Sequence, residues 1–373
     1  MVLTSAARPG IDGPPCGPLS GRTDRGLLLS LRHLGDAVIA AGFVQALRKQ
    51  NPAMPVNVLG LPQHEEVFRS LCRIDRYFRI DLPLFRHHRR SAASMAAALR
   101  TLRAVRRSRH RFCINLIGDV RENLIGRLSG ATWNIAPTWA PGHLFRNKIT
   151  GKLSFPAANC AIPIPAEYRS YYDSLRFFAA RLGLERLSSP TPSRVSASAQ
   201  PGHRLLVALH PGASHPSRRW PAAKWKSLIT ALRARGCRLL LIGAPDEEPA
   251  LRSEYGEEID RFRIDVVATG LQGFFSALSA ADALVGMDSL SAHAAHILGV
   301  PSVVLNGSAD FVIMTPPGSA AVSAGHLCPQ FPCYYRFPCT GTANEFVCCR
   351  GIEVEEVLHS LDRLLRAPPP AAN

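Results

Sequence analysis

Long apolar runs are missing from this chain of 373 residues. No stretch approaches the roughly 18 consecutive apolar residues that mark a membrane-spanning helix, and residues 1–24 lack the apolar core of a secretory signal peptide. Hydrophobic residues still make up 46% of the chain, which is ordinary for a globular protein. We therefore expect a soluble or peripheral protein.

Several ligand-binding signatures are also absent. The chain contains no Asp-x-Asp pair, which is a common metal-binding signature, and no GxxxxGK[ST] loop. No GxGxxG sequence follows a predicted strand. These absences argue against a P-loop nucleotidase and against a dinucleotide-dependent oxidoreductase.

Acidic residues are scarce: 28 Asp and Glu face 44 Lys and Arg, which gives a formal net charge of +16. The excess is concentrated in Arg86–Arg111, which holds nine Arg, three His and no acid. Within it, Ser91–Val105 is predicted to form a basic amphipathic helix. Three interpretations of this helix compete. It is an ordinary surface helix with a solvated basic face, it rests on anionic lipid, or it binds an anionic glycan acceptor. We favour lipid or glycan over nucleic acid, because no nucleic-acid-binding motif accompanies the charge. The apolar residues at helical spacing are Met95, Leu99, Leu102 and Val105.

Cysteine is unevenly placed, since five of the ten cysteines fall within Cys328–Cys349. Four thiolates in this segment would suffice for a structural zinc ion, but the spacing lacks the usual CxxC pairs. Disulfides are the alternative, although a cytoplasmic protein keeps its thiols reduced. We expect an ordinary, irregular insertion.

The most informative segment is His210–Pro221, which reads His-Pro-Gly-Ala-Ser-His-Pro-Ser-Arg-Arg-Trp-Pro. A predicted strand, Leu205–Leu209, precedes it, and a predicted helix, Ala222–Arg235, follows. Free N–H groups and the positive end of a helix at such a junction bind anions. Arg218 and Arg219 add forked donors that suit phosphate. The alternative is an ordinary connection with solvated arginines.

Two further strand-to-helix junctions carry carboxylates. Asp288 and Ser289 follow a short apolar strand and precede the predicted helix Ser291–Leu298, and ligands of open α/β sheets bind at such strand ends. Asp36 follows the predicted strand Gly26–Leu31 and precedes a helix, so that it would face a cleft between two domains. Each of these residues can instead be a helix cap.

The chain is long enough for two domains. We expect a disordered extension at residues 1–24, a first domain at 25–190, a linker at 191–202 and a second domain at 203–373. The first domain has strand patterns at Val56–Leu59 and Phe112–Ile117, followed by helix-like segments up to Leu182. In the second domain strands and helices alternate, which is typical of a parallel sheet covered on both faces.

Together the three junctions resemble the signatures of the ADP-heptose:lipopolysaccharide heptosyltransferases, glycosyltransferase family 9. The family's opening signature matches Leu34-Gly35-Asp36, its central signature matches His210–Pro221, and its third matches Asp288–His293 with a following Gly-Val-Pro. The resemblance runs from about residue 26 to 365. It implies the GT-B architecture, in which two Rossmann-like domains face a central cleft.

The resemblance also implies roles for individual residues. Asp36 matches the catalytic base, and Arg218 stands where the family usually has a lysine that balances the diphosphate charge. Leu290 stands where the family usually has glycine, which allows close approach of the backbone to a ligand. The donor-binding positions are Ala213, Ser214, Arg218, Glu247, Asp288, Ser289 and His293, with possible support from His33, Gly35 and His210.

The implied activity is inverting transfer of a heptose or related sugar from an ADP-sugar to a lipid-linked, anionic acceptor of the lipopolysaccharide inner core. It requires neither a metal nor another cofactor, and the enzyme would lie at the inner face of the cytoplasmic membrane. A different nucleotide-sugar donor, a GT-B-like module with weak or no catalysis, and a basic polyanion-binding protein stay open as alternatives.

Overall fold

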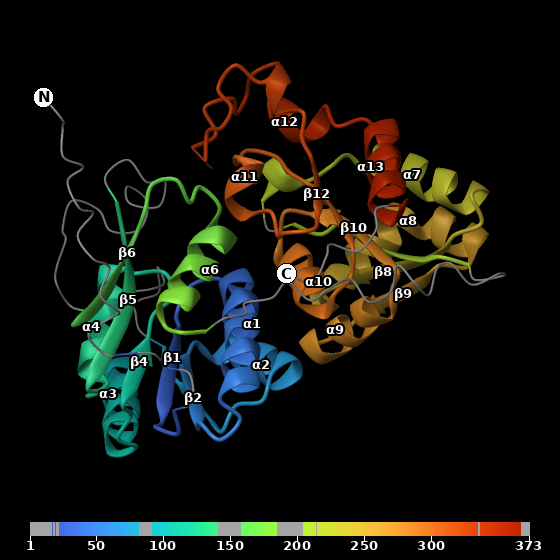
Figure 1. Cartoon of the computed structure of the whole chain (residues 1–373). Helices are drawn as coiled ribbons and strands as arrows, with labels where there is room; N and C mark the ends of the chain where they lie inside the picture. The colour runs from blue at the N-terminus through green and yellow to red at the C-terminus, as the bar shows by residue number, and fades with distance from the viewer. Residues whose placement is uncertain are drawn as a thin grey trace, which may run out of the picture.

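The computed structural model describes Gly17, Leu19 and residues 22–81, 92–140, 158–184, 204–213, 215–334 and 336–366. Figure 1 shows two α/β halves side by side, the first in blue and green and the second in yellow to red. Each half contains one six-stranded sheet. The expected class of two Rossmann-like domains is therefore confirmed.

The N-terminal sheet is entirely parallel. Its strands are β1 (Gly26–Ser30), β2 (Val56–Gly60), β3 (Arg76–Arg79), β4 (Phe112–Ile114), β5 (Trp133–Trp139) and β6 (Cys160–Ile164). They lie in the order β3-β2-β1-β4-β5-β6. Every residue of β1 and β2 is buried, as expected where helices cover both faces of a sheet.

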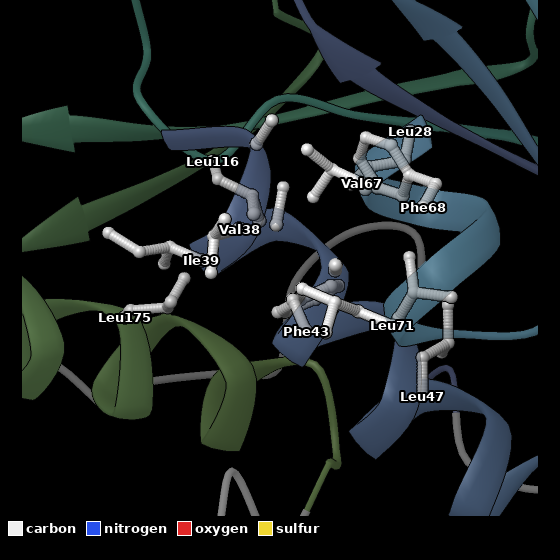
Figure 2. Close-up of a cluster of buried hydrophobic side chains, with 14 of the residues drawn as sticks. Leu28, Val38, Ile39, Phe43, Leu47, Val67, Phe68, Leu71, Leu116 and Leu175 are labelled. Atoms are coloured by element: carbon white, nitrogen blue, oxygen red, sulfur yellow. The ribbon is translucent and has the colours of Figure 1, made fainter. Parts of the chain in front are cut away.

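Helices cover both faces of this sheet. One face carries α1 (Leu34–Gln50), the turn η1 (Pro62–His64), α2 (Glu65–Leu71) and α6 (Tyr171–Arg181), and the other carries α3 (Ala92–Arg107) and α4 (Val120–Leu128). Figure 2 shows Phe43 of α1 between the side chains of α2 and Leu175 of α6. The first face is the one that turns toward the second domain.

The helix-like reading of residues 118–182 was wrong for β5 and β6. The edge strand β6 has alternate side chains exposed, and it includes Pro163. In β5 the pairing with β4 ends at Ile135, so Pro137 lies beyond the last β4 residue. These prolines remove N–H donors where the ladder tolerates the loss, and they hide the strand pattern in the sequence.

The C-terminal sheet is also entirely parallel. Its strands are β7 (Leu206–His210), β8 (Arg238–Gly243), β9 (Asp265–Ala268), β10 (Ala283–Met287), β11 (Ser302–Leu305) and β12 (Ala320–Val322). They lie in the order β12-β11-β10-β7-β8-β9. Relative to its own first strand, this order is the same as that of the first sheet.

The helices of the second domain pack on its sheet in the same way. One face carries α7 (Ala222–Ala234), α8 (Glu248–Phe262) and α13 (Val354–Arg366), and the other carries α9 (Leu271–Ala280) and α10 (Leu290–Leu298). Short helical turns connect these elements. They are η2 (Pro216–Arg218), η3 (Pro245–Glu247), α11 (Phe311–Met314), η4 (Gly325–Leu327) and α12 (Val347–Arg350).

The two domains share a hydrophobic cluster. Phe43 of α1 belongs to the same buried cluster as Phe274 of α9 and Ala294 of α10. A Cβ atom added at Gly42 of α1 would lie only 3.0 Å from Cδ1 of Ile297, so the backbones of α1 and α10 pass close together. The strand ends of both sheets are therefore held near one another.

The domain boundaries stay a prediction, because residues 185–203, which include the expected linker, lie outside the described residues. Most of the expected extension, residues 1–24, also lies outside them. Leu19, however, is fully buried, and its N–H donates to the Leu182 carbonyl over 2.7 Å. In the described ranges, no helix combines the length and apolar character that crossing a membrane requires.

Candidate active site

The candidate site lies where the strands of the two sheets end. In the second domain β7 and β10 are neighbours, and the chain leaves β7 toward α7 and leaves β10 toward α10 on the opposite face. A crevice forms where the connections diverge in this way, and it is the usual ligand position in open α/β sheets. His210 ends β7 and Asp288 follows β10.

His210 is the centre of a polar group in this crevice. Its Nδ1 atom lies 3.3 Å from Ser289 Oγ, and its Nε2 atom lies 4.0 Å from Glu247 Oε2. Burial lowers the pKa of His210, although the nearby Glu247 carboxylate opposes this shift. Glu247 also accepts the Ala244 N–H over 2.8 Å. The site thus holds a neutral imidazole between a hydroxyl and a carboxylate.

Arg218 reaches into the same crevice from η2. Its Nη1 atom donates to the Asp288 carbonyl over 3.1 Å, which joins the β7 and β10 junctions. Helix α7 begins at Ala222 as predicted, and η2 lies within the loop that leads to it. Arg219 donates to the Ala213 carbonyl over 3.3 Å. Ser214 lies outside the described residues.

Helix α10 begins beside His210. Ser289 is its N-cap, and its side chain does not bond to the N–H groups of the helix. Ser289 Oγ instead lies 3.0 Å from Ser291 Oγ. Leu290, at the position where the resembling family has glycine, packs its half-buried side chain against the hydrophobic cluster shared by the domains.

His293 connects this crevice with the first domain. Its Nδ1 atom lies 2.7 Å from the hydroxyl of Tyr172, which is on α6. A Cβ atom added at Gly35 would lie 3.1 Å from His293 Cδ2, so the start of α1 packs directly on this ring. Burial lowers the pKa of His293, opposed by the carboxylates of Asp288 and Asp36.

Asp36 lies in the first turn of α1, beyond the end of β1. Its Oδ2 atom accepts the His33 N–H over 3.2 Å, so Asp36 is also a capping residue, as one alternative had it. His33 is exposed and acts on Asp36 through this backbone contact. Asp36 also lines a small pocket at the ends of β1 and β4, together with Arg32 and Glu122.

The structure brings most of the predicted site residues together. His210, Arg218, Glu247, Asp288, Ser289 and His293 form one connected group, and His293 brings Gly35 and Asp36 against it. Sequence reasoning missed Tyr172 and Glu122. Neither lies in a recognisable motif, and each reaches the site only through packing of α6 or α4.

Cysteines form no metal centre in the described part of the chain. No group of three or more His, Cys, Asp or Glu residues there is placed to hold a metal ion. Cys328, Cys333, Cys339, Cys348 and Cys349 are all free thiols. Burial raises the pKa of Cys348 to about 11 and that of Cys349 to about 12. The thiols of Cys348 and Cys349 are therefore protonated at neutral pH.

Sequence comparison identifies relatives of the second half of the chain. Residues 184–338 match the family described as glycosyltransferase family 9 (heptosyltransferase). Lipopolysaccharide heptosyltransferase 1 of Pseudomonas aeruginosa is 30% identical over 151 residues. That match covers 37% of this chain and 37% of the relative's own length.

Structural comparison extends to nearly the whole chain. A glycosyltransferase family 9 structure from Veillonella parvula has a TM-score of 0.65 at 18% identity, covering 94% of this chain and 99% of that one. An E. coli heptosyltransferase solved with ADP-2-deoxy-2-fluoro heptose has a TM-score of 0.67 at 16% identity, covering 91% and 99%. E. coli ADP-heptose lipopolysaccharide heptosyltransferase II has a TM-score of 0.63 at 16% identity, covering 91% and 98%. These matches show that the fold is GT-B.

Proposed function

We propose that this chain, whose residues 184–338 match glycosyltransferase family 9, is an inverting glycosyltransferase. It moves a heptose or a related sugar from an ADP-sugar to an acceptor of the lipopolysaccharide inner core, without a metal ion. The observation that carries the proposal is the contact of His293 with Gly35, because it sets Asp36 of one domain against the polar crevice of the other.

The proposed reaction needs a base for the acceptor hydroxyl and positive charge for the departing diphosphate. Asp36 supplies the base, and a positioned general base accelerates such a step by roughly 10²–10⁴-fold. Arg218 and the N-terminus of α10 supply the positive charge, because the side chain of Ser289 leaves the first N–H groups of that helix for an anionic ligand. Stabilisation of this kind is usually the largest single contribution to catalysis.

The remaining residues of the crevice face the donor in this proposal. Asp288 and Glu247 supply acceptors for sugar or ribose hydroxyls. His210 is neutral, because burial lowers its pKa, and it fixes Ser289 beside the diphosphate. Arg218 differs from the lysine usual in the family, since its planar fork contacts a phosphate with two donors.

The first experiment is calorimetric titration of the protein with ADP, UDP and GDP, followed by a transfer assay with ADP-heptose and a lipid A core acceptor. We expect selective binding of ADP and transfer that inverts the anomeric centre. Selective binding of UDP or GDP would overturn the ADP-sugar donor. Binding of ADP without any transfer would favour a nucleotide-binding module, and steeply salt-dependent binding of polyanions alone would favour the basic binding protein.

The basic helix α3 supports a position at the membrane surface. Met95 and Leu99 are 51% and 49% exposed, whereas Val105 is fully buried, so only part of the predicted apolar stripe faces the core. Leu124 and Leu128 of α4 are exposed as well, at 48% and 41%. Residues 86–91 of the basic segment lie outside the described residues.

The charge around these apolar side chains has one sign. Helix α3 contains no Asp or Glu, and the one acid of α4, Glu122, is buried. Exposed arginines surround the apolar groups on both helices, and they are Arg100, Arg103, Arg106, Arg107, Arg121 and Arg127. Apolar side chains ringed by cations suit the anionic, cytoplasmic leaflet that carries a lipid-linked acceptor.

Vesicle sedimentation tests this position. We expect the protein to bind vesicles that contain phosphatidylglycerol and not vesicles of phosphatidylcholine alone. The variant Arg100→Ser/Arg103→Ser should lose about 1 kcal/mol of binding free energy per arginine, and Leu99→Ser should also weaken binding. Phe311→Ser, at an exposed phenylalanine of the other domain, is the matched control. Equal binding to both kinds of vesicle would overturn the proposal.

A further inference from the structure

Glu122 is a buried carboxyl group for which the proposed reaction has no assigned use. It lies in the first turn of α4, is only 2% exposed, and its Oε2 atom has no hydrogen-bond partner. Asp119, three residues earlier, is equally buried, but it accepts hydrogen bonds from the N–H, Nε and Nη2 groups of Arg121 over 2.8–3.0 Å. Of these two buried carboxyl groups at the start of α4, Glu122 is therefore the one with an unpartnered oxygen.

The surroundings of Glu122 connect it with the proposed base. Glu122 and Asp36 line the same pocket at the ends of β1 and β4, together with Arg32, Asn115 and Tyr171. Strands β1 and β4 are neighbours, and the chain leaves them toward opposite faces of the sheet, into α1 and α4. The pocket is therefore the crevice at the strand ends of the N-terminal sheet. Its cavity volume is about 10 Å³, which is room for one water-sized group.

The environment of Glu122 favours the uncharged acid. Burial is the main cause that raises its pKa to about 8, and the carboxylates of Asp119 and Asp36 raise the pKa further. The guanidinium groups of Arg32 and Arg121 oppose the shift. At pH 7 the side chain therefore carries a proton and can donate a hydrogen bond.

We propose that Glu122 is a positioning residue of the transferase. It donates a hydrogen bond toward Asp36 across the small pocket that both side chains line. This hydrogen bond holds the Asp36 carboxylate in place for the acceptor hydroxyl. The inference rests on the proposed function. Glu122 takes no proton from the substrate; the proton of the acceptor hydroxyl passes to Asp36. Ionised Glu122 would instead place a second negative charge beside the base, because both carboxyls line the same pocket.

The pH dependence of kcat tests this role with Glu122→Gln and Glu122→Leu. We expect wild-type kcat to fall above about pH 8, where Glu122 ionises. The Gln variant keeps an N–H donor and cannot ionise, so its alkaline decline should disappear. The Leu variant should lose about tenfold or more in kcat, because a hydrogen bond to a charged group is lost, with little change in KM for the donor.

Asp119→Asn is the matched control, since it changes a buried carboxyl of the same helix that is fully paired. It should lower thermal stability and keep the alkaline decline, shifted to lower pH because the Asp119 carboxylate no longer raises the pKa of Glu122. ADP titration and thermal unfolding show whether each variant is folded. If the Glu122→Gln enzyme is active and its kcat falls at alkaline pH as the wild-type kcat does, the proposed role of Glu122 is overturned. The proposed transferase activity is not affected by that result.

Infrared spectroscopy provides a readout that does not need activity. The wild-type spectrum at pH 7 should contain the carbonyl band of a protonated carboxyl group that Glu122→Gln lacks and that high pH removes. Absence of this band would overturn the uncharged state of Glu122. Presence of the band in a protein that transfers no sugar would instead refute the proposed function, so the two failures are distinguishable.

Discussion

In both sheets the first strand along the chain pairs with the fourth, β1 with β4 and β7 with β10. Each pair therefore opens a crevice at its strand ends. In the N-terminal crevice carboxyl groups gather, namely Asp36, Asp119 and Glu122, with Arg32 among them. In the C-terminal crevice a buried neutral imidazole, His210, lies between Ser289 and Glu247 and near Arg218.

This difference teaches that topology gives each domain a binding crevice, whereas the side chains at the strand ends decide its chemistry. A crevice in which a carboxylate, Asp36, lies beside an uncharged acid, Glu122, suits removal of a proton. A crevice with a cation and the start of α10 suits an anionic leaving group. The predictions below test this division of labour, in order of decreasing expected effect.

The substitution Asp36→Asn should have the largest effect. Loss of a general base is expected to lower kcat by roughly 10²–10⁴-fold. The asparagine side chain can still accept the His33 N–H that caps α1, so ADP affinity and thermal unfolding should stay close to wild type. Kinetic assays with ADP-heptose, together with calorimetry, measure both quantities. A variant that retains most of its kcat would show that the N-terminal crevice does not supply the base.

The substitution Arg218→Ala should act on the other crevice. Removal of a cation that binds phosphate is expected to weaken ADP affinity by about 10- to 100-fold. Arg235→Ala is the matched control, because Arg235 is exposed and paired with Asp362 over 3.0 Å, away from the crevice. Calorimetry compares the two variants. Equal effects would indicate that only overall charge matters.

The substitution Tyr172→Phe tests the contact between the crevices. It removes the hydroxyl that lies 2.7 Å from His293 Nδ1 and leaves a buried ring nitrogen without that partner, which should cost about 1–3 kcal/mol of the free energy of unfolding. Tyr171→Phe is the comparison variant, because its hydroxyl donates to the Leu116 carbonyl over a longer distance of 3.5 Å. Urea unfolding should rank Tyr172→Phe as the more damaging change, and the reverse ranking would contradict the prediction.

A smaller effect is expected from one histidine in each domain, the buried His110 and the half-buried His296. Burial lowers the pKa of His110 and that of His296 to about 4. In the unfolded chain a histidine titrates near 6.5, so between these values the unfolded state binds more protons. Stability is therefore complete above pH 6.5 and is lost as pH falls toward 4.

Thermal unfolding between pH 7 and pH 5 measures this loss. His110→Gln and His296→Gln should each make the pH dependence shallower, by up to about one proton. A slope unchanged in both variants would place the titration elsewhere in the protein.

Much of the fold was predictable because apolar runs and helical spacing are local signals. The predicted helices at Ala222–Arg235 and Ser291–Leu298 are found as α7 and α10. The strands β5 and β6 were not predicted, because prolines and the exposed side of an edge strand disguise them. The short turn η2, within the loop after His210, was also not visible in the pattern.

The sequence by itself determined the fold class and the positions of Asp36, Arg218 and Asp288, because residue order places each of them at a strand-to-helix junction, and ligands bind at such junctions. The tertiary structure decided which junctions meet. Packing of α1 on α10 sets Gly35 against His293, and folding of α4 under β4 buries Glu122 beside Asp36. Such contacts join residues that lie far apart in the chain, and local periodicity does not encode the burial that sets their charge.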